Sequence, residues 1–298
     1  MNVSPEVIDA GYDACRRMAR RSGSSFYPSF FGLPREKRRA MDALYAFMRH
    51  TDDLADDPQA DDAAEALRQW RAALDAARKD RFDRIGNVPH QELLPAVADM
   101  LRRYRVPPEH LHAVIDGVEM DLKRRRYETF DELEGYCERV ASAVGLACVH
   151  IWGFTGREAL EPARKCGIAL QLTNILRDLR EDARVDRVYL PLEDLRRCGY
   201  SVEDLKNGVA DGRFLHLMDF QIHRAQWFYR EGAELMQWLE PSGRRIFGMM
   251  TSTYRAVLRK IERRPAKVLT RRVRLGRLKK LQLALRWALL PPRAAALV

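Results

Sequence analysis

Two acidic clusters are the residues of this chain best placed to do chemistry. The first comprises Asp52 and Asp56, in the run RHTDDLADD that begins at Arg49. On a helix, residues four apart share a face, and these two continue the face of the preceding apolar residues. Near a helix C-terminus the backbone dipole disfavours each negative charge by roughly 0.3–1 kcal/mol. Two acids in this place favour a bound cation.

The second cluster is a polar stripe on an otherwise apolar segment. Its members recur at spacings of three and four residues, which places them on one side of a helix. They are Gln171, Asn174, Asp178 and Asp182. A helix that is apolar on its other sides is predicted to be buried, so the stripe would line an internal cavity.

Carboxylates four residues apart can share a hard cation. Mg²⁺ prefers oxygen ligands and is typically held by one or two carboxylates together with substrate phosphate oxygens. If the two clusters face each other, they would hold Mg²⁺, or Mn²⁺ in its place, over a diphosphate. Such a metal promotes departure of the diphosphate and leaves an allylic cation. Arg49 and Arg177, which lie beside the clusters, could clamp the same phosphates. The alternative is that both acidic runs are solvated helix faces.

The elements that must position these residues are predicted to be helices. Apolar residues recur at helical spacing along most of the chain, and alternating strand-like runs are scarce. We therefore expect an all-α fold and a single domain over residues 1–298. The expected helices cover Pro34–Asp57, 62–80, 91–104, 108–126, 130–155, 158–181, 214–238, 241–262 and Arg277–Leu290.

Composition and charge narrow the class further. The chain has 298 residues, 46% of them hydrophobic, and no apolar run of 18 residues that would span a bilayer. Its five cysteines form no metal-ligand spacing, and no signal peptide is evident, so we expect a cytoplasmic location with free thiols.

The net charge of +10 is unevenly distributed. The segment 255–298 holds fourteen Lys and Arg residues and one acid, Glu262. In its expected final helix, leucines line one side: Leu278, Leu281, Leu285 and Leu289. Such a segment could hold the protein at an anionic membrane surface, on the inner face of the cell membrane, or could be a solvated helix. Nucleic acid is not an expected partner, because aromatics are sparse there and no nucleic-acid-binding motif appears.

Together with their flanking residues, the clusters resemble the signatures of squalene and phytoene synthases. The first signature matches the segments Ser24–Tyr27 and Tyr45–Asp56, and the middle element matches Tyr136–Gly145. The second signature matches the segment 170–182, followed by Arg187–Pro191. The resemblance runs in order from about residue 12 to about residue 290.

This resemblance implies an all-α isoprenoid-synthase fold around a central cavity, and head-to-head joining of two prenyl diphosphates. The implied metal ligands are Asp52, Asp56, Asn174, Asp178 and Asp182. The implied substrate-binding residues are Ser24, Phe26, Arg49, Gln171, Asn174, Arg177 and Arg187. The implied catalytic residues are Tyr45, Arg49, Tyr136, Arg177 and Tyr189, although the sequence alone favours an ordinary core aromatic at each tyrosine.

One departure from the family pattern bears on the product. Many relatives have Lys or Arg just before the Ser/Thr-Phe pair, where this chain has Ser24. The form Gly-Ser-Ser-Phe-Tyr resembles the bacterial presqualene diphosphate and hopanoid branch. We therefore expect two farnesyl diphosphates to give presqualene diphosphate, with squalene as a further product. Phytoene from geranylgeranyl diphosphate is the alternative.

Two questions stay open at this point. The sequence does not settle use of NADPH, because reductive members of the family also lack a dinucleotide-binding fingerprint. A non-catalytic scaffold built on the same fold is the rival from another class. It predicts eroded aspartates, whereas Asp52, Asp56, Asp178 and Asp182 are all present.

Overall fold

The structure is a computed structural model that describes residues 3–21, 30, 32–56 and 62–289. Within these residues it is helical throughout and contains no strand; backbone pairing of the β type is confined to two isolated bridges, Arg126 with Val188 and Phe154 with Leu239. The all-α prediction is confirmed. None of the described helices is long and apolar enough to cross a bilayer.

Fourteen α-helices follow one another in the described part of the chain. They are α1 (Pro5–Arg21), α2 (Arg35–Asp56), α3 (Ala63–Arg78), α4 (Leu94–Arg103), α5 (Pro108–Lys123), α6 (Phe130–Cys137), α7 (Ala143–Trp152), α8 (Leu160–Arg184), α9 (Leu192–Arg197), α10 (Val202–Lys206), α11 (Gly212–Ala233), α12 (Leu235–Trp238), α13 (Pro241–Glu262) and α14 (Arg277–Leu289).

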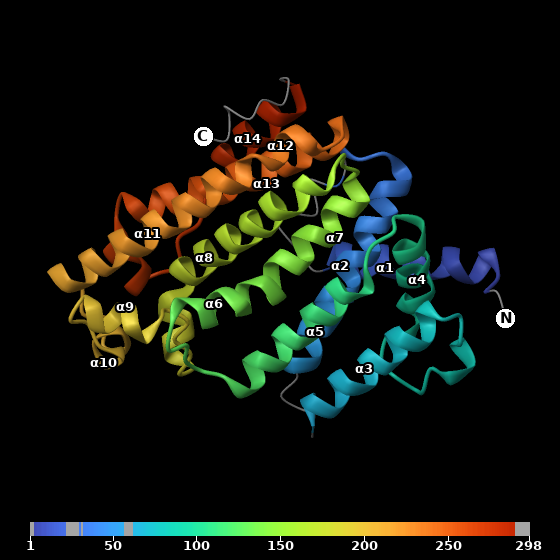
Figure 1. Cartoon of the computed structure of the whole chain (residues 1–298), viewed down its shortest axis with the longest axis horizontal. Coiled ribbons are helices and arrows are strands. Elements are labelled where there is room, and N and C mark those ends of the chain that lie inside the picture. Colours follow the sequence, from blue (N-terminus) through green and yellow to red (C-terminus); the bar gives the residue numbers. More distant parts are fainter. Residues whose placement is uncertain (1–2, 22–29, 31, 57–61, 290–298) are drawn as a thin grey trace.

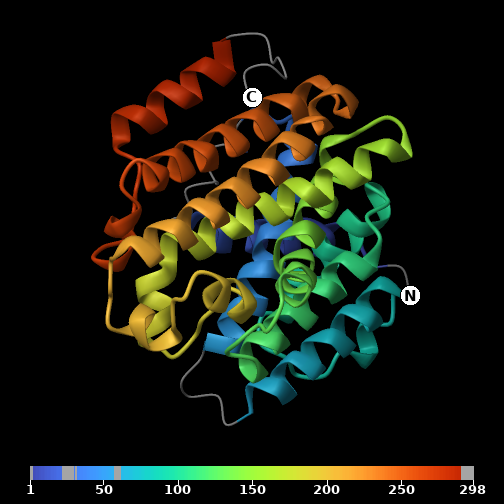
Figure 2. The ribbon, with the colours of Figure 1, turned by 60° about the vertical axis from the view of Figure 1, so that its left-hand side comes forward.

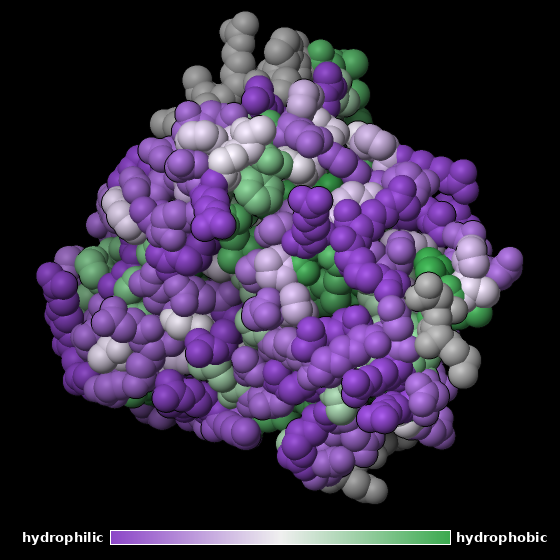
Figure 3. Space-filling view, turned by 45° about the vertical axis from the view of Figure 1, so that its right-hand side comes forward, coloured by the Kyte–Doolittle hydropathy of each residue, from purple (hydrophilic) through white to green (hydrophobic). Residues whose placement is uncertain are grey.

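Helix α8 lies at the centre of the bundle (Figure 1). It packs against α11 and α13 on one side and against α7 on the other. Helix α2 packs against α1, α4 and α5, and α7 contacts both α2 and α8. Two clusters of buried side chains follow this division, one centred on α1–α5 and α7, the other on α8, α11 and α13. The face in Figure 3 is mostly hydrophilic, with apolar side chains visible in narrow gaps between polar ones.

The expected helix 130–155 is interrupted in the middle. Helix α6 is followed by a π-helical turn, Glu138–Ser142, and then by α7. The turn packs tightly on α8, because a Cβ added to Gly167 would lie only 2.5 Å from the Cα of Ser142. The Ser142 hydroxyl also donates to the Arg164 carbonyl at 2.6 Å. Single π-turns in α-helices are frequent at functional sites. This one begins at Glu138, close to the predicted site residue Tyr136.

Other helix boundaries differ from prediction at the ends. The expected segment 214–238 is divided into α11 and α12, and α8 extends to Arg184, beyond the expected end at residue 181. Two short helices, α9 and α10, were not expected at all. Each is six residues or fewer, too short to show a helical period, and α10 begins with a capping box between Ser201 and Asp204.

Asp42 on α2 is a carboxyl group buried in the core. It is 1% exposed, and its Oδ1 atom has no hydrogen-bond partner among the described residues. Burial raises the pKa of this carboxyl from 3.8 to about 6, although Arg38, Arg16 and Arg20 oppose the shift. A folded-state pKa above the unfolded value means that the folded protein loses stability as Asp42 ionises with rising pH.

We therefore expect Asp42→Asn to raise the free energy of unfolding by about 1–3 kcal/mol above pH 6, and to leave it nearly unchanged below about pH 4. Urea denaturation across this pH range measures the difference. If the difference is the same at both ends of the range, the buried charge is not its cause.

Candidate active site

The polar stripe of the second cluster lies along α8 and is half-buried. Gln171, Asn174, Asp178 and Asp182 are all partly buried, whereas the intervening Leu172, Ile175 and Leu179 are buried in the core. The Asn174 Nδ2 atom donates to the Gln171 Oε1 atom at 3.2 Å. The stripe is therefore not a solvated helix face.

Asp178 is held by two arginines, its neighbour Arg177 and the distant Arg272. Arg177 Nε donates to its Oδ1 at 2.8 Å, and Arg272 donates to both of its oxygens, at 2.7 and 2.9 Å. Burial acts to raise the pKa of Asp178, but the hydrogen bonds and positive charges of the two arginines hold the pKa below its usual value. The carboxylate is thus kept ionised within a cluster of guanidinium groups.

Asp182, one turn further along α8, has the opposite environment. Burial and the negative charges of Asp178 and Asp121 raise the pKa of this carboxyl to about 7, against the influence of Arg187. Asp178 and Asp182 thus lie one turn apart, and their surroundings shift the two pKa values in opposite directions.

Three tyrosines form a stack beside the stripe. Ring centroids are 5.2 Å apart for Tyr136 and Tyr189, and 5.4 and 5.9 Å from Tyr127 to each of them. The hydroxyl groups of Tyr136 and Tyr189 donate to the two oxygens of Asp121, at 2.9 and 2.8 Å. The Arg187 Nη2 atom donates to the Asp121 carbonyl at 3.5 Å. Asp121, near the end of α5, therefore organises both predicted catalytic tyrosines.

The same contacts determine what these phenols can do. Burial, followed by the charge of Asp121, raises the pKa of both Tyr136 and Tyr189 well above the usual value. Both phenols therefore stay protonated at neutral pH and act as hydrogen-bond donors. A role as an unaided base, already weak for tyrosine, is disfavoured by this environment.

The first cluster lies at the C-terminal end of α2. Asp52 is exposed, whereas the side chain of Asp56 lies outside the described part of the structure. Arg49 forms an ion pair with Asp53, with both side chains about half exposed, and its Nε atom lies 3.1 Å from Asp53. Tyr45, one turn before Arg49, is partly buried against the N-terminal core. The structure thus pairs Arg49 with Asp53.

The part of the site that the structure describes does not contain a closed metal cage. Among the described residues, no three His, Cys, Asp or Glu side chains are close enough to hold an ion together. The α8 donors nevertheless fit a cation, because the buried Oδ1 atom of Asn174 accepts no hydrogen bond from a described residue and Asp182 has no adequate counter-charge. The magnesium ligands therefore stay a prediction.

A cavity of about 600 Å³ opens beside Arg177 and Arg272. Its polar residues are Arg177, Tyr254, Arg272, Arg274, Lys280 and Thr253. Its other walls are apolar side chains from α13, α14 and the segment between them: Met249, Met250, Val257, Val273, Leu275, Leu281 and Ala284. A cavity that combines basic side chains with apolar walls suits an amphipathic anion.

Two predicted site residues are not described by the structure, and two residues that contact the site were not predicted. Ser24 and Phe26 lie outside the described residues. Asp121 and Arg272 were not predicted, although both contact predicted site residues. Asp121 carried one usable signal, an acid at the end of an expected helix, whereas Arg272 was hidden among the many basic residues of segment 255–298.

Arg272 should bind the phosphate of a substrate, since it contacts Asp178 at the end of the cavity. We expect Arg272→Ala to raise KM for a prenyl diphosphate about 10- to 100-fold, because charge-assisted hydrogen bonds are worth roughly 1.5–3 kcal/mol. Steady-state kinetics measures this. Arg271→Ala is the matched control, since Arg271 is exposed and does not line this cavity. Equal effects of the two changes would contradict the assignment.

With this geometry in view, comparison with known proteins identifies the class. The family model of squalene/phytoene synthase matches residues 19–279. The chain therefore belongs to the squalene/phytoene synthase family, whose members are prenyltransferases.

The relatives include phytoene synthases as well as squalene and dehydrosqualene synthases. The phytoene synthase of Arthrospira platensis is 36% identical over 283 residues, covering 90% of this chain and 89% of that protein. The 15-cis-phytoene synthase of Synechocystis sp. is 35% identical, with 92% and 83% covered. Among solved structures, squalene synthase HpnC from Alicyclobacillus acidocaldarius matches with a TM-score of 0.81 and 25% identity, covering 89% and 97%. A dehydrosqualene synthase matches with 0.83 and 27%, covering 95% and 97%.

Proposed function

We propose that this enzyme joins two molecules of one prenyl diphosphate head to head, by 1′-1 condensation, to a cyclopropylcarbinyl diphosphate. The observation that carries the proposal is the cavity of about 600 Å³, whose lining combines Arg177, Arg272 and two further basic side chains with apolar side chains. The arginines match a diphosphate, and the apolar walls match a prenyl chain.

The bonds broken and formed in this reaction balance. The C1–O bond of one substrate breaks, and its electron pair leaves with the diphosphate. The resulting allylic cation is attacked by the double bond of the second substrate, and loss of one proton closes the cyclopropane ring. The products are the cyclopropylcarbinyl diphosphate, free diphosphate and a proton.

The residues of the chain have separate parts in this reaction. Arg177 and Arg272, both held by Asp178, donate to phosphate oxygens of the substrate. Tyr136 and Tyr189, held by Asp121, present neutral hydroxyl groups. Mg²⁺ or Mn²⁺, when bound, supplies electrophilic stabilisation of the departing diphosphate. The side chains that would hold it are Asp52, Asp56, Asn174, Asp178 and Asp182.

Two substrate chain lengths are supported by different observations. Farnesyl diphosphate, giving presqualene diphosphate and further squalene, is supported by the Gly-Ser-Ser-Phe-Tyr form and by the fold similarity to a squalene synthase and a dehydrosqualene synthase. Geranylgeranyl diphosphate, giving phytoene, is supported by the 34–36% identity to phytoene synthases along most of the chain.

The test supplies each diphosphate separately to the purified protein with Mg²⁺, with and without NADPH, and identifies the lipid products by mass spectrometry. A C30 product from farnesyl diphosphate supports the presqualene branch, and its response to NADPH shows whether squalene follows. A C40 product supports phytoene synthesis. If the folded protein gives no product from either substrate, the reaction is refuted and the non-catalytic scaffold becomes the better hypothesis.

A further inference from the structure

Helix α14 carries an exposed apolar stripe, which the rest of the described surface does not match. Eight large hydrophobic residues are exposed among the described residues, and half of them lie on this one helix. They are Leu278, Leu281, Leu285 and Leu289, with exposed fractions of 69%, 55%, 49% and 75%. Spacings of three and four residues place them on one side of the helix, as predicted from the sequence. We call these four residues the leucine stripe.

The opposite side of α14 is anchored to α13, so the orientation of the stripe is defined. Leu283 and Trp287 are buried, and the Trp287 indole donates to the Ser252 hydroxyl at 3.0 Å. A Cβ added to Gly248 would lie 2.2 Å from the indole, so only glycine permits this packing. Figure 2 shows α14 at the edge of the molecule, lying over α13. Leu278, Leu285 and Leu289 therefore face away from the protein body, whereas Leu281 is exposed but also lines the cavity.

Basic residues flank the stripe and continue beyond it. Helix α14 contains four Lys and Arg residues and no acid. Next to the large cavity, and sharing three residues with it, is a pocket of about 450 Å³. Apart from Val273 it is lined only by basic residues: Lys260, Arg263, Arg264, Lys267, Arg271, Arg272 and Arg274. We call this the basic pocket.

We propose that the leucine stripe and the basic pocket form a docking surface for an anionic lipid bilayer, with α14 lying in the plane of the membrane interface. A helix with leucines on one side and Lys and Arg beside them is the type that inserts its apolar face among lipid headgroups. Each basic residue near an anionic surface strengthens this binding, and the long side chains can reach the phosphates from either side of the stripe.

Charge decides between a bilayer and a second copy of this chain. In a two-fold symmetric pair, the same patch would face itself. The basic residues beside one stripe would then oppose the identical residues of the other, with no acid on α14 to compensate. Anionic lipid offers the complementary charge, and the fluid interface accommodates the exposed leucines.

The position of α14 links this surface to the site, a step that rests on the proposed function. Lys280, Leu281 and Ala284 of α14 line the cavity of about 600 Å³ that ends at Arg177. Docking through the leucine stripe would bring this wall of the cavity to the membrane. A product with thirty or forty carbons could then pass into the bilayer without crossing water.

The test measures binding of the full chain to vesicles by co-sedimentation, using phosphatidylcholine alone and phosphatidylcholine mixed equally with phosphatidylglycerol. One variant, Leu278→Ser with Leu285→Ser and Leu289→Ser, removes most of the stripe but leaves the cavity-lining Leu281. A second, Lys279→Gln with Arg286→Gln, removes two charges beside it.

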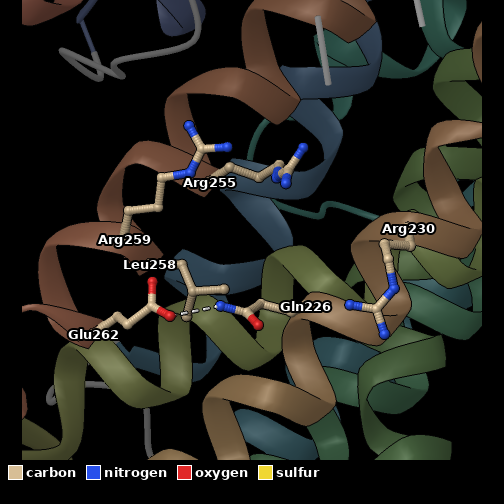
Figure 4. A pocket seen from close by; sticks show the side chains of 6 residues that line it. All are labelled: Gln226, Arg230, Arg255, Leu258, Arg259 and Glu262. Atoms are coloured by element: carbon tan, nitrogen blue, oxygen red, sulfur yellow. Dashed lines mark hydrogen bonds between the residues drawn. The ribbon is translucent and has the colours of Figure 1, made fainter. Parts of the chain in front are cut away.

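Matched controls come from other surfaces of the described chain. Leu215→Ser changes an exposed leucine on α11. Arg230→Gln with Arg259→Gln removes two charges from a separate pocket of about 300 Å³ between α11 and α13, where Gln226 donates to Glu262 at 3.0 Å (Figure 4). These controls have the same chemistry as the test variants but lie off the docking surface.

We expect the wild type to bind the anionic vesicles and to bind phosphatidylcholine far more weakly. The three-leucine variant should lose about 100-fold in affinity, and the two-charge variant about 30-fold, while both controls stay within about threefold. Absence of wild-type binding, or equal losses in test and control variants, overturns the proposal. Light scattering that shows a dimer dissociated by the three-leucine change would also overturn it, in favour of self-association.

Turnover in detergent micelles separates this proposal from the proposed function. The three-leucine variant should keep wild-type turnover in micelles while losing vesicle binding. If the wild type binds vesicles but turns over neither prenyl diphosphate in micelles, the reaction fails and the docking surface stands. If it turns over substrate but does not bind anionic vesicles, the docking surface fails and the reaction stands.

Discussion

Replacing Asp178 by asparagine is expected to lower kcat for head-to-head condensation by about 10²- to 10³-fold, the usual effect of removing one group that stabilises developing charge. Asp178 is the point where the polar stripe of α8 meets Arg177 and Arg272. Asparagine keeps the size of the side chain but removes the negative charge that attracts both guanidinium groups and any bound cation. The two arginines would then lose their fixed positions around the substrate phosphates.

The measurement is steady-state turnover, accompanied by thermal unfolding to show that the variant is folded. Glu181→Gln is the matched control, because it removes the same charge from an exposed position on the same helix. We expect the control to stay within about twofold of wild type. An Asp178→Asn enzyme that retains a third or more of the wild-type kcat would contradict the placement of the reaction at this end of α8.

Replacing Asp121 by asparagine is expected to lower kcat about 10²-fold with little change in KM. Each Asp121 oxygen accepts a hydrogen bond from one tyrosine hydroxyl, Tyr136 or Tyr189. Asparagine keeps one acceptor and places an NH₂ group against the other hydroxyl, which must turn away. The residue acts through the tyrosines, so the loss should fall on the chemical step and not on substrate binding.

A double-mutant cycle makes this prediction specific. If Asp121 acts by orienting Tyr136, then Asp121→Asn combined with Tyr136→Phe should cost much less than the product of the two single effects. Asp116→Asn is the control, because Asp116 lies on the same helix in a half-exposed ion pair with Arg71. Fully multiplicative effects would show that Asp121 and Tyr136 act independently, and the positioning role would be wrong.

The relation between sequence and structure differs between the two acidic clusters. On α8, the spacing of Asn174, Asp178 and Asp182 was sufficient to place these residues on one side of a helix, since helical period is a local property. On α2, the same reasoning predicted two inward-facing aspartates, but Asp52 is exposed and Arg49 is engaged by Asp53. The helical period predicts which residues share one face of a helix, whereas the packing of neighbouring helices decides whether that face is buried.

The sequence by itself determined the all-α class, the main helices, the α8 stripe, the leucine stripe of α14 and the family. All of these depend on residues close together in the chain. Only the tertiary structure decided that Asp121 holds two tyrosines, one of them 68 residues away, and that Arg272 reaches Asp178 across 94 residues. Such contacts arise from the packing of α5, α8 and the segment after α13, and no local period encodes which side chains that packing will bring together.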